Sequence, residues 1–422
     1  MGKAHEILKR YEDEIIKCMK CGNCQAVCPV YKETSLEGGV ARGKIQLAAA
    51  LLNGSLEYTK SVQEKFQTCL TCMACNAACP CGVKPDQIIL AARAALAEEV
   101  GLPFIKKSIF NVVSSPGLFD FGMKVGSKFQ GLALKKQKDN AFSPRFPVGL
   151  DMKRVFPSLA PKAFKDSVPE VTKVENPKFK VAFFTGCVTN YIYTSVGHAA
   201  VNVLAKNGVE VVVPKAQHCC GAPVLIHGDR KTAGDMAKSL VETFSKLDID
   251  AVITPCGTCG ESFQHNFVEL LAADPQYGPI AKELAKKTYD ISEFLIDKVK
   301  IDGRDLKPVN MKVTYHDPCH LVRGMNVSKQ PREILNMIPG LEFVEMKNAA
   351  RCCGGAGSFT LTHYDMSMSI HQTKINDINS TGASTLVTGC GSCRMQFEDG
   401  LYQAQMGVPV LHTIEILNMA YK

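Results

Sequence analysis

The chain has 422 residues, of which 46% are hydrophobic and 19 are cysteine, and its net charge is +8. This length is enough for two or three domains with buried cores. No apolar stretch approaches the ~18 to 20 residues of a membrane span. The polar N-terminus, MGKAHEILKRYEDEIIKC, has no apolar core of signal-peptide length. We therefore expect a cytoplasmic, metal-rich protein in a reducing compartment.

Two copies of one cysteine pattern occupy the first eighty residues. Each copy reads C-x2-C-x2-C-x3-C-P, the bacterial spacing for [4Fe–4S] clusters, in which the fourth cysteine ligates the other cluster. Structural zinc and disulfides are the alternatives, but zinc usually takes its thiolates as two separated pairs. We assign one [4Fe–4S] cluster to Cys18, Cys21, Cys24 and Cys79, and a second to Cys69, Cys72, Cys75 and Cys28.

Each cysteine run is followed by a predicted helix, over residues 43–52 and 85–100. Pro85 suits a first helical turn, and Gly54 and Gly101 suit helix ends. We predict an all-helical, ferredoxin-type domain over residues 1–100. The segment GGVARGK (38–44) matches the start of a phosphate loop, but Ile45 stands where Ser or Thr is required and no strand precedes it. We reject nucleotide binding there.

Residues 101–178 are predicted to form a basic, proline-containing helical connector. Between Gly101 and Lys180 fifteen Lys and Arg residues face six Asp and Glu residues, while the remainder of the chain is nearly neutral. Tryptophan is absent and aromatic residues do not alternate with the basic ones, which argues against nucleic-acid binding. The connector is either a solvated linker or a docking surface for an acidic partner or anionic lipid headgroups, with peripheral membrane contact.

From residue 179 the chain repeats itself with an offset of 132 to 134 residues. Short β-branched runs such as VAFF, AVIT, KVTY and TLVT each precede a cysteine-bearing loop and a helical pattern. This order predicts two α/β domains with parallel sheets, over residues 179–305 and 306–422. The fold class is therefore α+β multidomain. In such sheets the functional groups gather at the carboxyl ends of the strands.

Each repeat supplies five cysteines, including one adjacent pair. This is more than a zinc ion or a cubane requires, and the adjacent pair suits a larger or irregular cluster. A zinc site and a vicinal disulfide remain alternatives. The first candidate site is Cys187, Cys219, Cys220, Cys256 and Cys259; the second is Cys319, Cys352, Cys353, Cys390 and Cys393.

Three histidines, His218, His316 and His320, lie next to these cysteines in the sequence. They are candidates for hydrogen-bond donors to the ligands or for a proton relay, and otherwise for hydrogen-bonded core histidines. The nineteenth cysteine, Cys81, is predicted to be a buried thiol near a cluster. No catalytic residue can be named.

The CCG tripeptides at 219–221 and 352–354, each followed by a C-x2-C pair, resemble the cysteine-rich CCG domains of heterodisulfide reductases. They also resemble the iron–sulfur subunits of glycolate oxidase, lactate dehydrogenase and anaerobic glycerol-3-phosphate dehydrogenase. The order of motifs is most similar to the glycolate oxidase subunit, and GVARGKIQLAAALLNG resembles that family's Arg-Gly-x-Ile helix. The resemblance implies one or two further, noncubane [4Fe–4S] clusters in the CCG domains.

The resemblance also implies a hetero-oligomer with an FAD-containing 2-hydroxyacid dehydrogenase subunit, and an electron-transfer flavoprotein or a quinone as a further partner. No G-x-G-x-x-G lies between a predicted strand and helix, so we expect no flavin or NAD on this chain. Two functions follow as hypotheses. The chain is an electron-transfer subunit of a lactate or glycolate dehydrogenase complex, or it reduces a disulfide at a noncubane cluster.

Overall fold

The computed structural model describes residues 2–137, 141–146 and 151–421, so the parts of the predicted connector at 138–140 and 147–150 lie outside the described residues. Contacts divide the chain into two compact units, and each is described by itself. The first unit comprises Met1–Val112, Gly221–Ala233 and Cys352–Gln372, and the second comprises Val113–Cys220, Gly234–Arg351 and Thr373–Lys422. The predicted four-part division of the chain stays a prediction.

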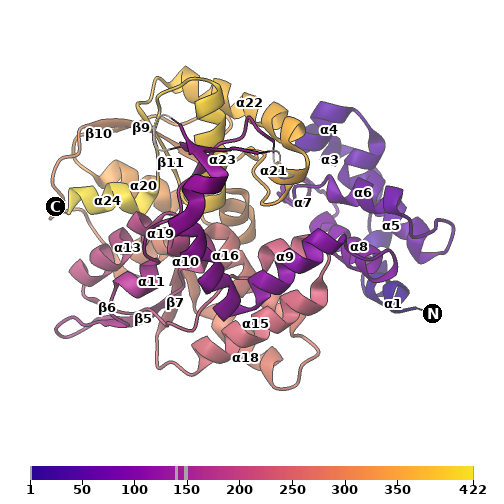
Figure 1. The fold of residues 1–422 in the computed structure, drawn as a ribbon, viewed down its shortest axis with the longest axis horizontal. Helices are drawn as coiled ribbons and strands as arrows, with labels where there is room; N and C mark the ends of the chain where they lie inside the picture. The colour runs from indigo at the N-terminus through magenta and orange to yellow at the C-terminus, as the bar shows by residue number, and fades with distance from the viewer. Residues whose placement is uncertain (1, 138–140, 147–150, 422) are drawn as a thin grey trace. The chain divides into compact units, whose positions relative to one another are not determined.

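The N-terminal part of the first unit is built from short helices around the two cysteine runs (Figure 1). In the described residues up to 112, no strand is present. The elements are α1 (Lys3–Lys9), α2 (Glu12–Ile16), α3 (Asn23–Val27), α4 (Pro29–Thr34), η1 (Glu37–Gly39), α5 (Ala41–Leu52), α6 (Lys60–Gln67), α7 (Ala74–Ala77), α8 (Pro85–Glu99) and α9 (Phe104–Ser114). The later segments of this unit add α14 (Ala222–Ile226) and α21 (Phe359–Thr362).

Helices α5 and α8 form the scaffold of this unit, and both lie where the sequence predicts them. Pro85 is the first residue of α8, a position at which its missing N–H costs no hydrogen bond. Gly54 and Gly101 follow the two helices with φ of 77° and 83°, the left-handed conformation that commonly ends a helix. Leu8, Phe66, Ile88 and other apolar side chains of α1, α6 and α8 share one buried core.

The first sheet of the second unit has the strand order β4-β6-β5-β7-β8, and its strands after β4 are parallel. The strands are β4 (Val171–Thr172), β5 (Phe179–Phe183), β6 (Val209–Val212), β7 (Ala251–Thr254) and β8 (Thr288–Asp290). The accompanying helices are α12 (Gly186–Tyr191), α13 (Thr194–Lys206), α15 (Arg230–Ser245), α16 (Gly257–Glu261), η3 (Ser262–Asn266), α17 (Phe267–Leu270), α18 (Tyr277–Lys286), α19 (Ile291–Glu293) and η4 (Phe294–Val299).

The second sheet repeats this arrangement in the order β10-β9-β11-β12, with all pairs parallel. Its strands are β9 (Met311–His316), β10 (Leu341–Phe343), β11 (Thr385–Thr388) and β12 (Val410–Leu411). Its helices are η5 (His320–Gly324), α20 (Lys329–Met337), α22 (Tyr364–Thr381), α23 (Gly391–Gln403) and α24 (Thr413–Ala420). The predicted parallel α/β repeats are therefore confirmed.

Both sheets contribute to one hydrophobic core. Val181 and Ile253 of the first sheet and Val313 and Val387 of the second belong to the same buried cluster. Helices α13, α19, α20 and α24 lie between the two sheets (Figure 1), where α13 packs on α24 and α19 packs on α20. The parts of the two repeats that belong to the second unit thus share one core.

The connector was predicted to be helical, but its described residues form both helices and short strands. Helix α10 (Pro116–Ala133) ends earlier than the pattern indicates, because Leu134–Lys136 form strand β1, which pairs antiparallel with β2 (Ala141–Pro144). Strand β3 (Phe156–Pro157) and helix α11 (Phe164–Ser167) follow. None of the helices in the described part of the chain combines the length and apolar content that a membrane span needs.

Candidate metal centres

The cysteines of the two N-terminal runs line two cavities in the first unit. Cys75 lines both, so the cavities are neighbours. Each cavity is lined by three cysteines of one run and the fourth cysteine of the other, and the first also by Cys75 and Cys81. The assignment of ligands stays a prediction. The cysteines of the first cavity are Cys18, Cys21, Cys24, Cys75, Cys79 and Cys81, and those of the second are Cys28, Cys69, Cys72 and Cys75.

The backbone of both cysteine loops alternates through the left-handed region at matching positions. In the first loop Lys20 and Gly22 have φ of 59° and 92°, and in the second Thr71 and Met73 have φ of 49° and 56°. Residues other than glycine pay roughly 1–2 kcal/mol for this conformation, so its repetition indicates a functional constraint. Such turns direct N–H groups toward an anion, and the Thr71 N–H donates to the Cys69 Sγ at 3.3 Å.

The second cavity makes free thiolates unfavourable. Burial, with a contribution from neighbouring cysteines, raises the pKa of the Cys28 thiol to about 11 and raises the pKa of Cys75 well above its usual value. A bound cation reverses this preference, because a coordinating thiol loses its proton. The donor set of four sulfurs around one cavity, with N–H groups directed inward, therefore fits an iron–sulfur cluster.

Two buried cations lie beside this second cavity. Lys44 lines it and is fully buried, and its Nζ donates to the carbonyl oxygens of Gly38 and Gly39 at 2.9 and 2.7 Å. Burial lowers the pKa of Lys44, while the Cys69 and Cys28 sulfurs act in the opposite direction. Arg93 of α8 is 1% exposed and donates from Nη2 to the Cys69 carbonyl at 2.6 Å. Both charges suit a site that carries negative charge.

The first cavity is nearer to solvent. Its Cys21 is exposed, and its adjacent cation, Arg42, is paired with Glu37 at 2.6 Å and donates to the Lys20 carbonyl at 3.3 Å. Cys81 also lines this cavity and is half-buried. The same cysteine spacing has therefore produced two sites with different surroundings.

The five cysteines of the first repeat converge after the carboxyl ends of three parallel strands. Cys187 follows β5, the adjacent pair Cys219 and Cys220 follows β6, and Cys256 and Cys259 lie at the start of α16 after β7. Interactions with Cys187 and Cys220 raise the pKa of Cys219, and interactions with Cys220 and Cys256 raise the pKa of Cys259. The side chains of the five cysteines are thus linked by pairwise interactions, each to the next.

Two glycines make room for these sulfurs. Gly186 has φ of 62°, and a Cβ atom there would lie 2.9 Å from the Cys259 Sγ. Gly221, the third residue of the first CCG tripeptide, has φ of 76° and lets the chain turn directly into α14. Only glycine adopts this conformation without strain, which gives the tripeptide a physical reason for its third residue.

The cysteines of the second repeat divide between the two units. Cys319, Cys390 and Cys393 belong to the second unit, and Cys352 and Cys353 belong to the first, where both are buried. In the second unit the Cys390 Sγ lies 3.9 Å from the Cys256 Sγ. These two cysteines occupy equivalent positions of the two repeats, so the repeats meet through their sulfur-bearing loops.

Comparisons with known proteins match the same cysteine-bearing segments of the chain. A family described as a 4Fe-4S dicluster domain matches residues 14–83, and a family described as a cysteine-rich domain matches residues 181–264 and 313–398. The chain is 31% identical to a probable glycolate oxidase iron-sulfur subunit from Bacillus subtilis, over 96% of this chain and 94% of that protein. The chain belongs to this family of iron–sulfur oxidoreductase subunits.

Other relatives belong to enzymes with different activities. A subunit of the fumarate reductase (CoM/CoB) from Methanothermobacter marburgensis is 32% identical over 96% of this chain and 72% of that protein. A subunit of the dihydromethanophenazine:CoB–CoM heterodisulfide reductase from Methanosarcina barkeri is 28% identical over 96% of this chain and 93% of that protein. All three relatives are subunits of oxidoreductases, and so is this chain.

The histidines beside the cysteines of this iron–sulfur subunit have distinct environments. His218 bonds through Nδ1 to the Cys219 carbonyl at 3.0 Å, and burial lowers its pKa. His316 is buried with its ring 4.8 Å from that of Phe397. Burial opposes the charge of His320, but the Glu261 carboxylate, 3.0 Å from its Nδ1, outweighs it and raises the pKa to about 10. His320 is therefore a charged, paired histidine.

Three residues near the centres were not identified from the sequence. Lys44 belongs to the segment rejected as a phosphate loop, and its real partners are carbonyl oxygens. Arg93 interrupts the alanine-rich run IILAARAALA. Because its helical neighbours are apolar, the Arg93 side chain could have been predicted to be buried. Glu261 gave no local indication, because its partner His320 lies 59 positions further along the chain.

Proposed function

We propose that this iron–sulfur subunit carries electrons within a flavin-dependent 2-hydroxyacid dehydrogenase complex. An FAD-containing partner oxidises lactate or glycolate, and the electrons pass through the clusters of this chain to a quinone or to an electron-transfer flavoprotein. The complex works at the inner face of the cytoplasmic membrane, with this chain as a peripheral member of a hetero-oligomer. The similarity to the probable glycolate oxidase iron-sulfur subunit supports this proposal.

The observation that carries the proposal is the proximity of successive sulfur sites. Cys75 lines both N-terminal cavities, and Cys256 and Cys390 bring the loops of the two repeats within 3.9 Å. Iron–sulfur clusters transfer single electrons, and closely spaced clusters form a conducting path. In this proposal Cys18, Cys21, Cys24 and Cys79 hold one [4Fe–4S] cluster and Cys69, Cys72, Cys75 and Cys28 hold the other.

The CCG cysteines are proposed to hold one or two further, noncubane [4Fe–4S] clusters. The five cysteines of the first repeat exceed the four ligands of a tetrahedral ion and suit a larger cluster. The second site would combine Cys319, Cys390 and Cys393 with Cys352 and Cys353. Neither flavin nor NAD is assigned to this chain.

A second function has its own support. The chain carries all ten CCG cysteines, and its relatives include a heterodisulfide reductase component. In this alternative a disulfide is reduced at a CCG site, with the N-terminal clusters supplying two electrons one at a time and two protons completing the two thiols. The chain would then be a catalyst and not only a carrier.

The first experiment is anaerobic purification followed by iron and sulfide analysis and EPR. About sixteen iron atoms per chain, with an unusual signal in the oxidised state, are expected if both repeats hold clusters. About eight iron atoms, the content of two cubanes, would contradict clusters in the CCG repeats and leave a simple two-cluster carrier.

A pull-down and a turnover assay separate the two functions. Co-purification of an FAD-containing hydroxyacid dehydrogenase that reduces the clusters when its substrate is added is the expected result. Reduction of a disulfide by the isolated chain with reduced viologen would favour the alternative.

A further inference from the structure

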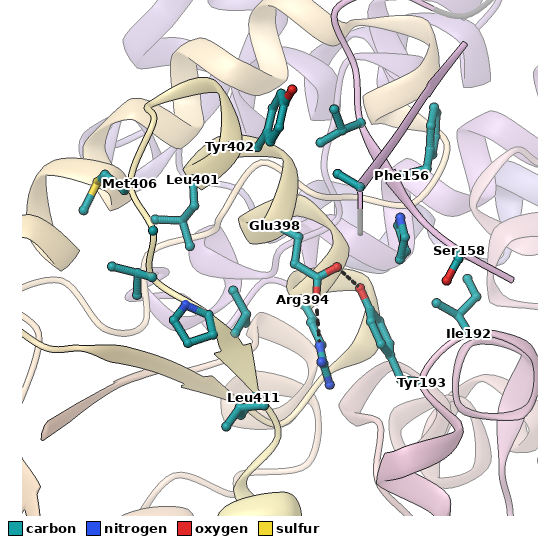
Figure 2. A pocket seen from close by; sticks show the side chains of 17 residues that line it. Phe156, Ser158, Ile192, Tyr193, Arg394, Glu398, Leu401, Tyr402, Met406 and Leu411 are labelled. Atoms are coloured by element: carbon teal, nitrogen blue, oxygen red, sulfur yellow. Dashed lines mark hydrogen bonds and ion pairs between the residues drawn. The ribbon is translucent and has the colours of Figure 1, made fainter. Parts of the chain in front are cut away.

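A half-open cavity of about 440 Å³ lies in the second unit, between the connector and the end of the second repeat (Figure 2). Strand β3 forms one wall, and α23 with the loop into β12 forms the other. Most of the lining is apolar. The side chains that give it this character include Val155, Leu401, Met406, Val408, Val410 and Leu411.

Three polar side chains of the lining lie together, between apolar groups on either side. The Tyr193 hydroxyl donates to Glu398 at 2.6 Å, and Arg394 donates from Nε to the other oxygen of Glu398 at 2.9 Å, as Figure 2 shows. Arg394 also donates to Glu415 at 2.8 Å, so two carboxylates balance its charge. Arg394 and Glu398 are the charged residues among the described lining. The cavity therefore favours a neutral ligand over a carboxylate or phosphate.

Two of these polar side chains adjoin a proposed cluster ligand. Tyr193 and Arg394 also line a small neighbouring cavity, whose other lining residues include Cys390 and His412. In the first turn of α23, the main-chain N–H of Arg394 donates to the main-chain carbonyl of Cys390 at 3.0 Å. A flat apolar ligand that lies against Tyr193 would thus be separated from the Cys390 site by a single layer of side chains.

We infer that this cavity binds the head group of an isoprenoid quinone. The inference rests on the proposed function, which requires an electron acceptor. A quinone head group is neutral and apolar and carries two carbonyl oxygens that accept hydrogen bonds, and Ser158 supplies a hydroxyl on the lining. Apolar concave sites with a few precisely placed polar groups are typical of cofactor binding. The pair of electrons and two protons released when a hydroxyacid becomes a ketoacid convert the quinone to the hydroquinone.

The connector next to the cavity has the character of a membrane-facing element. Gln130 of α10 bonds through its side chain to the main-chain N–H and carbonyl of Leu159, at 2.9 and 3.3 Å, so α10 is tied to the segment that forms the cavity wall. Lys128 and Lys135 are exposed nearby. Helices with an apolar face and lysines lie in the interface of anionic membranes, where such quinones dissolve. The exposed apolar side chains of α10 are Leu118, Phe121, Val125, Phe129 and Leu132.

The test measures binding, independently of turnover. The probe is 2-heptyl-4-hydroxyquinoline N-oxide, a fluorescent quinone analogue, titrated into the anaerobically purified full chain. Val408→Trp fills the cavity and is expected to weaken binding at least tenfold. Val171→Trp is the matched control, because Val171 is an exposed residue of β4 outside the cavity. It is expected to bind as the wild type does.

Each outcome decides the inference. Equal binding by Val408→Trp and the wild type, or no saturable binding to the wild type, would overturn it. If Val408→Trp fails to fold, as judged by its iron content, a photoreactive azidoquinone replaces it. Labelling of peptides 155–158 or 401–411 supports the cavity, and labelling elsewhere rejects it. If the clusters still accept electrons from a hydroxyacid dehydrogenase while the analogue does not bind, the quinone site fails and the proposed function stands.

Discussion

The two N-terminal cysteine loops have the same backbone and different surroundings. Both loops pass through the left-handed region at matching positions, and both direct three sulfurs to one cavity. The second cavity includes the buried Cys72 and adjoins the buried Lys44 and Arg93, whereas the first includes the exposed Cys21 and an ion-paired Arg42. The difference shows that cysteine spacing determines ligand geometry, while packing determines the charge and solvent around the site. Charge, hydrogen bonds and exposure set cluster potentials.

The largest effect is expected from removing a ligand of the second cavity. Cys75→Ser should eliminate one [4Fe–4S] EPR signal, about four iron atoms, and electron transfer along the chain. It should also destabilise the first unit by about 3–5 kcal/mol, because Lys44 and Arg93 would lose their counter-charge. Iron analysis, EPR and calorimetry measure these changes.

Two cysteine variants complete this test. Cys24→Ser should also lose one cluster but lower the melting temperature less, because its cavity is nearer to solvent. Cys81→Ser should keep its full iron content. A Cys75→Ser protein with unchanged iron would show that the ligand assignment is wrong.

An intermediate effect is expected from the buried lysine. Lys44→Met removes a positive charge beside the second cavity, which disfavours the more negative, reduced cluster. A unit charge acting over about 10 Å at an effective dielectric constant of about 20 contributes about 1.7 kcal/mol, so the midpoint potential should fall by ~70 mV. Redox titration followed by EPR measures the shift.

Lys65→Met is the matched control for this change, because Lys65 is an exposed lysine of α6. Its potential should be unchanged. The Lys44 variant should also lose stability, since the carbonyls of Gly38 and Gly39 lose their donor. An unchanged or higher midpoint potential in Lys44→Met would contradict the claim that the buried charge of Lys44 raises the potential of the second cluster.

The smallest effect is expected at Arg42, the half-buried cation beside the first cavity. Arg42→Gln should shift the potential of the first cluster by less than ~20 mV, because solvent and salt screen surface charges. The shift should diminish further as ionic strength rises. A shift as large as that of Lys44→Met, and insensitive to salt, would mean that the first cavity is as poorly screened as the second.

Much of the fold was predictable because its patterns are local. The runs VAFF, AVIT, KVTY and TLVT overlap β5, β7, β9 and β11. Short runs of β-branched and aromatic residues favour strands, and this preference can be read from a few neighbouring residues. The connector was less predictable. LALKKQKD continues the helical pattern of α10, but Leu134–Lys136 instead pair with β2. The periodicity of a segment does not reveal a strand partner that lies further along the chain.

The sequence by itself determined the spacing of the cysteines in each N-terminal run and the position of CCG cysteines after strand ends. Both follow from spacing over a few residues. Only the tertiary structure decided that Lys44 and Arg93 are buried beside one cavity and that Cys256 meets Cys390 from 134 positions away. It also decided that Tyr193 and Arg394 line both the proposed quinone cavity and the small cavity beside Cys390. Burial and long-range contact depend on how distant segments pack, and no local spacing encodes that packing.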